Sequence, residues 1–195
     1  MRRLVLGLDG LVRLREAIGG PSLPAAAALA AVAGADAVRL GLSEEHESPS
    51  ERDLREVAAT GAALELRMAP IPSLVKTALE ARPARVLLAS AGPGGTVLPL
   101  DFRAWSNVLV PTLRTLAEAG VAAVAVVGPD LAHVKAAHGV NARGVELYTG
   151  ALVDLPLAER VEALSRLGDA ARLAAKLRLE VALGGRLDEI GRAHV

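Results

Sequence analysis

The chain has 195 residues, of which 52% are hydrophobic and 23% charged, and it contains no cysteine. Its 22 basic residues balance 22 acidic ones, which argues against a nucleic-acid or membrane-surface partner. The lack of cysteine excludes a disulfide scaffold, a thiolate zinc site and a cysteine nucleophile. No uncharged apolar run reaches the roughly 18–20 residues of a membrane span. We therefore expect a cytoplasmic protein with a single domain over residues 1–195.

Short apolar runs alternate with helical stretches along the chain. The runs are nearly continuous in Leu, Val and Ala, which is typical of strands buried on both faces of a parallel sheet. The predicted strands are Leu4–Leu8, Ala37–Leu42, Ala62–Met68, Arg85–Ala89, Val121–Val127, Gly144–Tyr148 and Leu179–Leu183. The predicted helices are Pro24–Ala33, Glu51–Thr60, Ile71–Ala81, Pro111–Ala119, Leu131–His138 and Leu157–Leu177.

Helix starts carry recognisable capping signals. Ser50 and Asp53 have the spacing of a capping box, and Asp130 and Asp154 stand where N-caps belong. The alternation of strands and helices indicates an α/β protein with right-handed crossovers. A doubly wound sheet and a (β/α)8 barrel both fit this pattern. In either fold, binding sites form on the loops that follow the carboxyl ends of the strands.

Segments over nearly the whole chain resemble the pyridoxine 5′-phosphate synthase family of vitamin B6 biosynthesis. They match in order and spacing, and they are Leu8–Gly10, Leu14 with Arg15, Ala33–Asp36, Glu44, Arg52 with Asp53, Leu66–Ala69, Glu80 with Pro83, Glu146–Gly150 and Val181–Leu187. The resemblance implies a TIM-type (β/α)8 barrel that forms a homo-oligomer. It also implies a transferase that condenses 1-deoxy-xylulose 5-phosphate with 3-amino-2-oxopropyl phosphate, without a metal or an organic cofactor.

The resemblance fails at the positions that carry the family's acid–base chemistry. Histidines of the family are replaced on the first, second, sixth and seventh strands, and the glutamate that shuttles protons on the third strand is an arginine. The residues at these positions are Gly10, Gly41, Arg67, Tyr148 and Gly185. The remaining candidates for binding substrate or phosphate are Asp9, Arg15, Glu44, Glu146, Thr149, Gly150, Gly184, Arg186 and Gly191.

These replacements bear directly on the family reaction. Closing the pyridoxine ring needs several proton transfers by groups that titrate near neutrality. Arg67 stays protonated and cannot act as a base. Glu65 faces the same side of the strand but lies roughly 6–7 Å deeper, too far to substitute with unchanged geometry. We expect a pseudoenzyme with a non-catalytic binding or assembly role. The alternative is an active pyridoxine 5′-phosphate synthase-type enzyme with a rearranged site.

Side-chain alternation predicts a charged barrel interior. Charges there persist only when they are paired and hydrogen-bonded. We hypothesise that Arg67 bridges Glu146 or Asp9 and plugs the mouth where substrate would lie. The other interpretation is a structural polar layer with no ligand. The interior positions are Asp9, Arg39, Glu65, Arg67, Glu146 and Tyr148, and the ion-pair candidates among them are Arg39, Glu65, Arg67 and Glu146.

The last residues raise two further expectations. Gly184–Arg186 and Ile190–Arg192 suit a small phosphorylated ligand, since glycine permits close approach and arginine binds bidentately, but both also suit ordinary turns. Glu189–Val195 resembles the family's eighth strand, so we expect the seventh helix to be deleted and the eighth to be absent. Such a barrel closes irregularly, leaves an open edge, or has its edge covered by another subunit. We favour a homo-oligomer, because an uncovered edge invites association.

Overall fold

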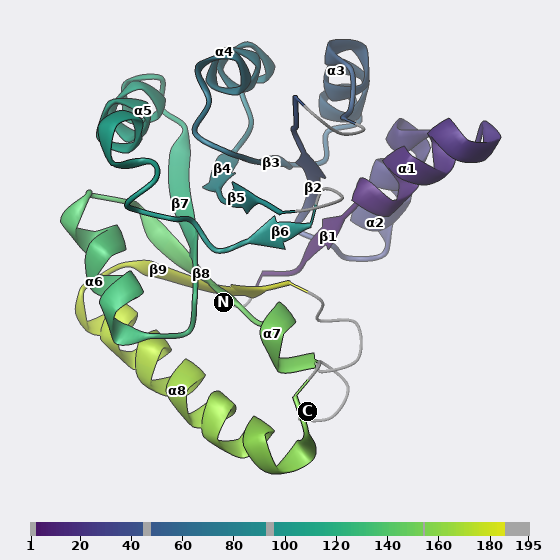
Figure 1. Cartoon of the computed structure of the whole chain (residues 1–195). Coiled ribbons are helices and arrows are strands. Elements are labelled where there is room, and N and C mark those ends of the chain that lie inside the picture. Colours follow the sequence, from purple (N-terminus) through teal and green to yellow (C-terminus); the bar gives the residue numbers. More distant parts are fainter. Residues whose placement is uncertain (1–2, 45–47, 93–95, 154, 186–195) are drawn as a thin grey trace.

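The computed structural model describes residues 3–44, 48–92, 96–153 and 155–185. Seven parallel strands form one sheet in the order β1-β2-β3-β4-β7-β8-β9. Neighbours in the sheet follow the order of the chain, which is the arrangement of a barrel and not of a doubly wound sheet. Figure 1 shows the sheet curled, with helices on its outside. The strands are β1 (Val5–Gly7), β2 (Ala37–Gly41), β3 (Leu64–Met68), β4 (Arg85–Leu88), β7 (Ala122–Val127), β8 (Gly144–Tyr148) and β9 (Glu180–Gly184).

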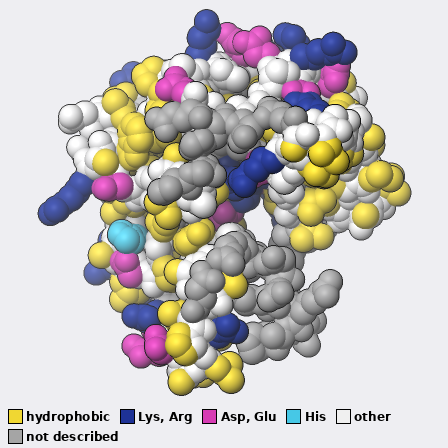
Figure 2. Space-filling model, turned by 45° about the vertical axis from the view of Figure 1, so that its right-hand side comes forward, with side chains coloured by type: hydrophobic (Ala, Val, Ile, Leu, Met, Phe, Trp, Pro, Cys, Tyr) yellow, Lys and Arg dark blue, Asp and Glu magenta, His cyan; other side chains and the backbone are white. Residues whose placement is uncertain are grey.

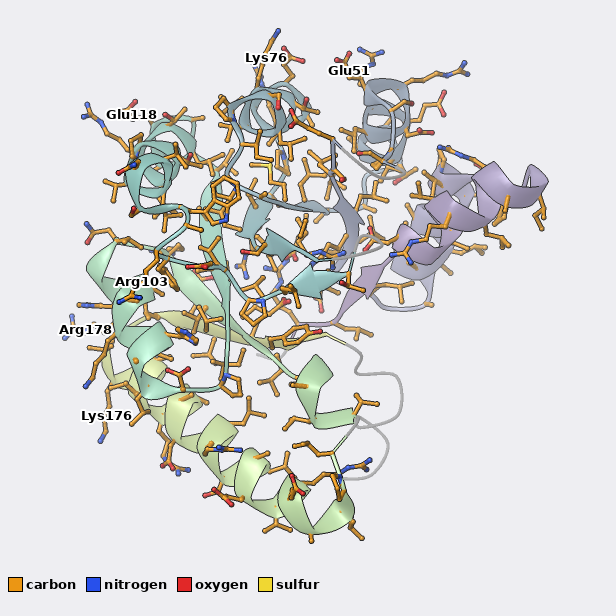
Figure 3. All side chains as sticks on the ribbon, in the orientation of Figure 1. Glu51, Lys76, Arg103, Glu118, Lys176 and Arg178 are labelled. Carbon is orange, nitrogen blue, oxygen red and sulfur yellow. The ribbon has the colours of Figure 1, made fainter. Side chains whose placement is uncertain are left out.

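Helices connect consecutive strands, and a two-stranded hairpin follows β4. Figure 3 shows charged side chains on the outer helices, among them Glu51, Lys76, Glu118 and Lys176, pointing away from the sheet. The helices are α1 (Asp9–Ile18), α2 (Leu23–Val32), α3 (Glu51–Ala59), α4 (Pro72–Ala81), α5 (Ser106–Glu118), α6 (Leu131–Gly139), α7 (Gly150–Val153) and α8 (Leu157–Lys176). The hairpin consists of β5 (Ser90–Ala91) and β6 (Val97–Leu98).

The seven predicted strands are confirmed, and so are the predicted caps of two helices. Ser50 and Asp53 form the capping box of α3, and the Asp130 side chain accepts a hydrogen bond at the start of α6. Pro156 precedes α8, while Asp154 lies outside the described residues. The prediction that a helix begins at Pro111 is wrong, because α5 starts at Ser106 and continues through the proline.

Two helices and the hairpin are not predicted from the sequence. Leu8, the N-cap residue of α1, and Val12 are buried one turn apart, but this pattern merges with the apolar run of β1. The helix ends at Gly19, which adopts the left-handed conformation (φ 67°) that favours glycine. The four-residue α7 and the hairpin are too short to produce a periodic signal.

The two faces of the sheet have different chemistry. The outer face packs against the helices through the main apolar core, in which Val38, Leu66 and Val145 are almost completely buried. The inner face carries charges in register: Arg39 of β2 pairs with Glu65 of β3, which is in register with Arg85 of β4. The core therefore holds the helices on the sheet, while the charged side chains project into the concave interior.

The sheet has two edges in the described part of the chain, β1 and β9. Leu6 on β1 is 47% exposed and Leu183 on β9 is 49% exposed, although both are in register with buried core residues of the neighbouring strands. Residues 189–195, which we expect to resemble an eighth strand, lie outside the described residues. No helix among the described residues is long and apolar enough to span a membrane.

Candidate functional site

An ion pair joins β1 to β3 at the carboxyl ends of these strands. Asp9 is the first residue of α1, and its Oδ2 accepts a 2.7 Å hydrogen bond from Nη2 of Arg67. Its Oδ1 accepts a 2.6 Å bond from the backbone N–H of Gly41. A Cβ on Gly41 would lie 3.1 Å from Oδ1 of Asp9 and 3.4 Å from Nη2 of Arg67. Glycine at this position thus leaves room for the ion pair where the family has a histidine.

A second arginine binds two buried glutamates deeper in the barrel. Arg39 contacts Glu65 at 2.9 Å and Glu146 at 2.8 Å, and the two glutamate side chains are only 1% and 4% exposed. Burial alone would lower the pKa of the Arg39 guanidinium. The charge of Glu146 and the hydrogen bonds to both glutamates outweigh burial and hold that pKa above its ordinary value. Because β2 and β8 are not neighbours in the sheet, this contact spans the curled interior.

A third group of charges lies at the amino ends of the strands. Arg85 on β4 contacts Glu180 on β9 at 2.6 Å, and Arg143 contacts the same glutamate at 2.8 Å. Arg85 also lies 3.9 Å from Glu65. The interior charges therefore form a connected layer from β9 to β2. The sequence did not indicate Arg85 or Glu180, because they meet across the barrel and 95 positions apart in the chain.

The β8 end of the mouth is filled by Tyr148. A Cβ on Gly150 would lie 2.2 Å from the Tyr148 hydroxyl oxygen, and one on Gly185 would lie 2.6 Å from its ring. The Thr149 hydroxyl is hydrogen-bonded to the Gly184 carbonyl at 3.0 Å. The space that Gly150 and Gly185 leave by having no side chain is therefore filled by the side chain of Tyr148.

Apolar side chains occupy the interior on the β4 and β7 side. Leu87, Val124 and Val126 are buried there, and Tyr148 packs against them. Val97 on the β5–β6 hairpin covers this cluster from above. The backbone N–H of Leu100, just after the hairpin, donates a 2.7 Å hydrogen bond to the carbonyl of Val126 and anchors the cover. Among the residues that the structure describes, these side chains leave the β1–β3 side of the mouth open.

A small pocket opens on that side, directly above the Asp9–Arg67 pair. Its volume is about 70 Å³. Figure 2 shows basic and acidic side chains next to each other in a hollow near the centre of the surface. A larger hollow of about 660 Å³ adjoins the pocket and extends towards Trp105. The pocket is lined by Asp9, Arg13, Gly41, Leu42, Ser43, Arg67, Met68, Ala69, Ala89, Ser90, Ala91, Thr96 and Val97.

The other candidates from the sequence lie away from the small pocket. Arg15 binds Asp53 through two hydrogen bonds of 2.5 and 3.0 Å, which join α1 to α3. Glu44 is hydrogen-bonded to Ser73 and lines the larger hollow. Gly10 has no atom within 4 Å of its Cβ position. Arg186 and Gly191 lie outside the described residues. Within the described part of the chain, no cluster of His, Cys, Asp or Glu is suited to hold a metal ion.

Comparison with known proteins decides the family. The sequence profile of the pyridoxal phosphate biosynthesis protein PdxJ family matches residues 4–191. The chain belongs to this family. The pyridoxine 5′-phosphate synthase of Desulforapulum autotrophicum is 35% identical over 196 residues, which cover 94% of this chain and 80% of that protein. The corresponding protein of Geobacter metallireducens is 32% identical over 198 residues, which cover 96% of this chain and 81% of that protein.

Solved structures support the fold assignment of this PdxJ-family chain. The crystal structure of the citrate synthase SbnG matches 86% of the chain, and the match covers 75% of SbnG. The TM-score is 0.57 and the sequence identity 14%. At this identity the likeness shows a common fold alone. The curled parallel sheet, with strands in chain order, is therefore a reduced TIM-barrel architecture.

Proposed function

We propose that this PdxJ-family barrel does not carry out the family condensation and instead has a binding or assembly role. The main observation in support is that arginines neutralise the interior carboxylates. Asp9 is paired with Arg67, while Glu65 and Glu146 are paired with Arg39. A carboxylate whose oxygens accept hydrogen bonds from a guanidinium is not free to reach a proton on a substrate. Arg67 stands where the resemblance implies a proton-shuttling glutamate, and a guanidinium has no lone pair available to act as a general base.

The histidines of the described residues offer no replacement. His133 and His138 both lie on α6, on the outside of the sheet. Family ring closure needs several proton transfers, and each missing acid–base group typically costs about 10²–10⁴-fold in rate. The loss of several such groups together supports a non-catalytic role.

Space at the mouth supports the same proposal. The pocket beside Asp9 and Arg67 has about 70 Å³, compared with roughly 300–1,000 Å³ for typical organic-ligand pockets. Tyr148 and the apolar cluster around Val126 fill the opposite side. The space directly at Asp9 and Arg67 therefore fits one small group of a ligand, such as a phosphate, and the rest of a ligand would have to extend into the adjoining hollow of about 660 Å³. The alternative, an active enzyme with a rearranged site, requires these side chains to move.

An activity assay tests the proposal directly. The purified chain is incubated with 1-deoxy-xylulose 5-phosphate and 3-amino-2-oxopropyl phosphate, and pyridoxine 5′-phosphate is measured by mass spectrometry. The Geobacter metallireducens relative serves as the comparison protein under the same conditions. We expect no product above the level without protein. Turnover by this chain would establish the alternative of a rearranged active site.

Exposed apolar side chains at the sheet edges of the described part of the chain support assembly as a homo-oligomer. Leu4 and Leu6 on the β1 side and Val181 and Leu183 on β9 are each more than 40% exposed. Edge strands with exposed apolar side chains readily associate, which lowers the apolar area in contact with water. Analytical ultracentrifugation over a range of concentrations is the test. A monomer at every concentration would contradict assembly.

A further inference from the structure

A second hollow lies at the opposite end of the barrel from the Asp9–Arg67 pair. Its volume is about 470 Å³, within the roughly 300–1,000 Å³ of typical organic-ligand pockets. Ala122 begins β7 and Glu180 begins β9, so this hollow lies at the amino ends of the strands, and we call it the amino-end groove. It is lined by Leu113, Ala117, Gly120, Val121, Ala122, Ala123, Asn141, Arg143 and Glu180.

The floor of the amino-end groove is apolar and fixed by packing. Leu113 of α5 and Val121, just before β7, are 7% and 6% exposed, and both belong to the main apolar core. Gly120 adopts the left-handed conformation (φ 76°), and a Cβ there would meet no atom within 4 Å, so the space beside Val121 is open. Covering this preformed floor with a hydrocarbon chain is favourable, because both apolar surfaces leave water.

Arginine and asparagine side chains provide hydrogen-bond donors at the rim of the groove. Arg143, just before β8, has a side chain that is 68% exposed, and its Nε donates to Oε1 of Glu180 at 2.8 Å. This contact uses one of the five N–H groups of a guanidinium. The other four, on Nη1 and Nη2, have no partner in the described part of the chain. The exposed Asn141 side chain lies at the same rim.

Glu180 fixes the position of Arg143 without occupying the Nη end of its guanidinium. The Oε2 atom of Glu180 accepts a 2.6 Å hydrogen bond from Arg85, and its Oε1 accepts the bond from Nε of Arg143. Both carboxylate oxygens thus have a guanidinium donor. The two Nη atoms of Arg143 remain as a planar pair of donors, the geometry that binds a carboxylate through two parallel hydrogen bonds.

We propose that the amino-end groove binds a small monocarboxylic acid. Its carboxylate lies on the Nη atoms of Arg143, assisted by the amide of Asn141, and its hydrocarbon chain covers Leu113 and Val121. The planar donor pair matches a carboxylate, and the apolar floor matches a chain of several carbon atoms. Because the groove is at the far end of the barrel from the mouth, this inference goes beyond the function proposed above and does not depend on it.

Isothermal titration calorimetry of the full chain with hexanoate and butanoate, at constant ionic strength, tests this assignment. Each buried methylene raises the affinity about fourfold, so we expect hexanoate to bind about tenfold more tightly than butanoate, or better. Hexan-1-ol has the chain without the charge, and inorganic phosphate has the charge without the chain. Both are expected to bind more weakly than hexanoate. Equal affinities for butanoate and hexanoate, or phosphate bound as tightly as hexanoate, would overturn the proposal.

A charge variant tests the role of the rim. Arg143→Gln removes the guanidinium, while Arg85 keeps its contact with Glu180. Arg114→Gln is the matched control, because Arg114 is also exposed and also donates through Nε to a glutamate, Glu118, but does not line the groove. We expect Arg143→Gln to weaken hexanoate binding about tenfold or more, as for loss of a charged hydrogen bond. Arg114→Gln is expected to bind like the wild type.

A third variant tests the contact of the hydrocarbon chain with the floor. Ala117 is exposed on α5 and lines the groove, so Ala117→Leu narrows the groove and keeps a good helix former at this position. We expect this variant to lose most of the preference for hexanoate over butanoate, and an unchanged preference would contradict the assigned floor. The proposal is also overturned if the wild type does not bind hexanoate at millimolar concentration, or if Arg143→Gln binds it as tightly as Arg114→Gln.

Discussion

The guanidinium of Arg67 holds the carboxylate of Asp9 at 2.7 Å across the carboxyl ends of β1 and β3. In a TIM barrel this end of the sheet is where the catalytic groups lie. Here the space contains a closed ion pair whose side chains are about one-fifth exposed. The position where the resemblance implies a proton-shuttling glutamate thus joins β1 to β3 at the barrel mouth.

Breaking this pair is expected to destabilise the protein. Asp9→Asn keeps an oxygen that accepts from Gly41 but removes the charge that Arg67 binds. Hydrogen bonds to charged groups contribute about 1.5–3 kcal/mol, so we expect the free energy of unfolding in urea to fall by this amount. A double-mutant cycle with Arg67→Gln isolates the pairwise energy. The control is Arg52→Gln, since its contact with Glu56 lies on the surface, where solvent screens it. Additive effects of the two mouth substitutions would contradict the assigned ion pair.

The glycine that ends β9 is expected to be required by the side chain of Glu146. A Cβ at Gly184 would lie 2.2 Å from Oε1 of Glu146, and Arg39 prevents that carboxylate from moving away freely. Gly184→Ala should therefore lower the free energy of unfolding by about 1–3 kcal/mol through overpacking. Gly10→Ala is the control, because its Cβ meets no atom within 4 Å and the residue is helical. Equal stability of the two variants in urea denaturation would refute the predicted clash.

Among the substitutions considered, removal of Arg39 is expected to lower the free energy of unfolding most. Arg39→Met leaves Glu65 and Glu146 buried without their main cation, and breaking such a buried pair typically costs about 3–5 kcal/mol. The triple variant with Glu65→Gln and Glu146→Gln removes the buried charges as well, so we expect it to regain much of the lost stability. Thermal and urea unfolding of both proteins measures the difference. A triple variant as unstable as Arg39→Met would show that buried charge is not the cause.

Local sequence signals predict the strands and most helices of this fold well. The apolar runs of the strands and the capping box at Ser50 depend on neighbours within a few residues, so each segment contains its own signal. Side-chain alternation likewise places Arg39, Glu65 and Arg67 in the interior. This parity is a property of any strand and does not depend on how the sheet curls.

Such local signals do not predict which charged side chains pair across the interior of the barrel. Alternation left Arg67 facing either Asp9 or Glu146, and the structure pairs it with Asp9 because Arg39 already binds Glu146. The choice depends on the curvature of the sheet, which brings β2 to β8 and β4 to β9. The contact of Arg85 with Glu180 is missed for the same reason. Curvature is set by the whole packed sheet, so no single segment encodes it.

The link between α1 and α3 is expected to make stability depend on acid pH. The hydrogen bonds from Arg15 are the main cause that lowers the pKa of Asp53 to about 2, and those from Ser50 assist. The ordinary value is 3.8, so the unfolded chain takes up this proton at a higher pH than the folded one. The stabilisation is therefore present above about pH 4 and is lost as the pH falls to about 2. Urea denaturation across this range should show a flatter pH dependence for Asp53→Asn. The control Asp169→Asn, which alters an exposed pair with Arg172, should retain the wild-type dependence because solvent weakens that contact. A wild-type slope in Asp53→Asn would show that other groups cause the acid sensitivity.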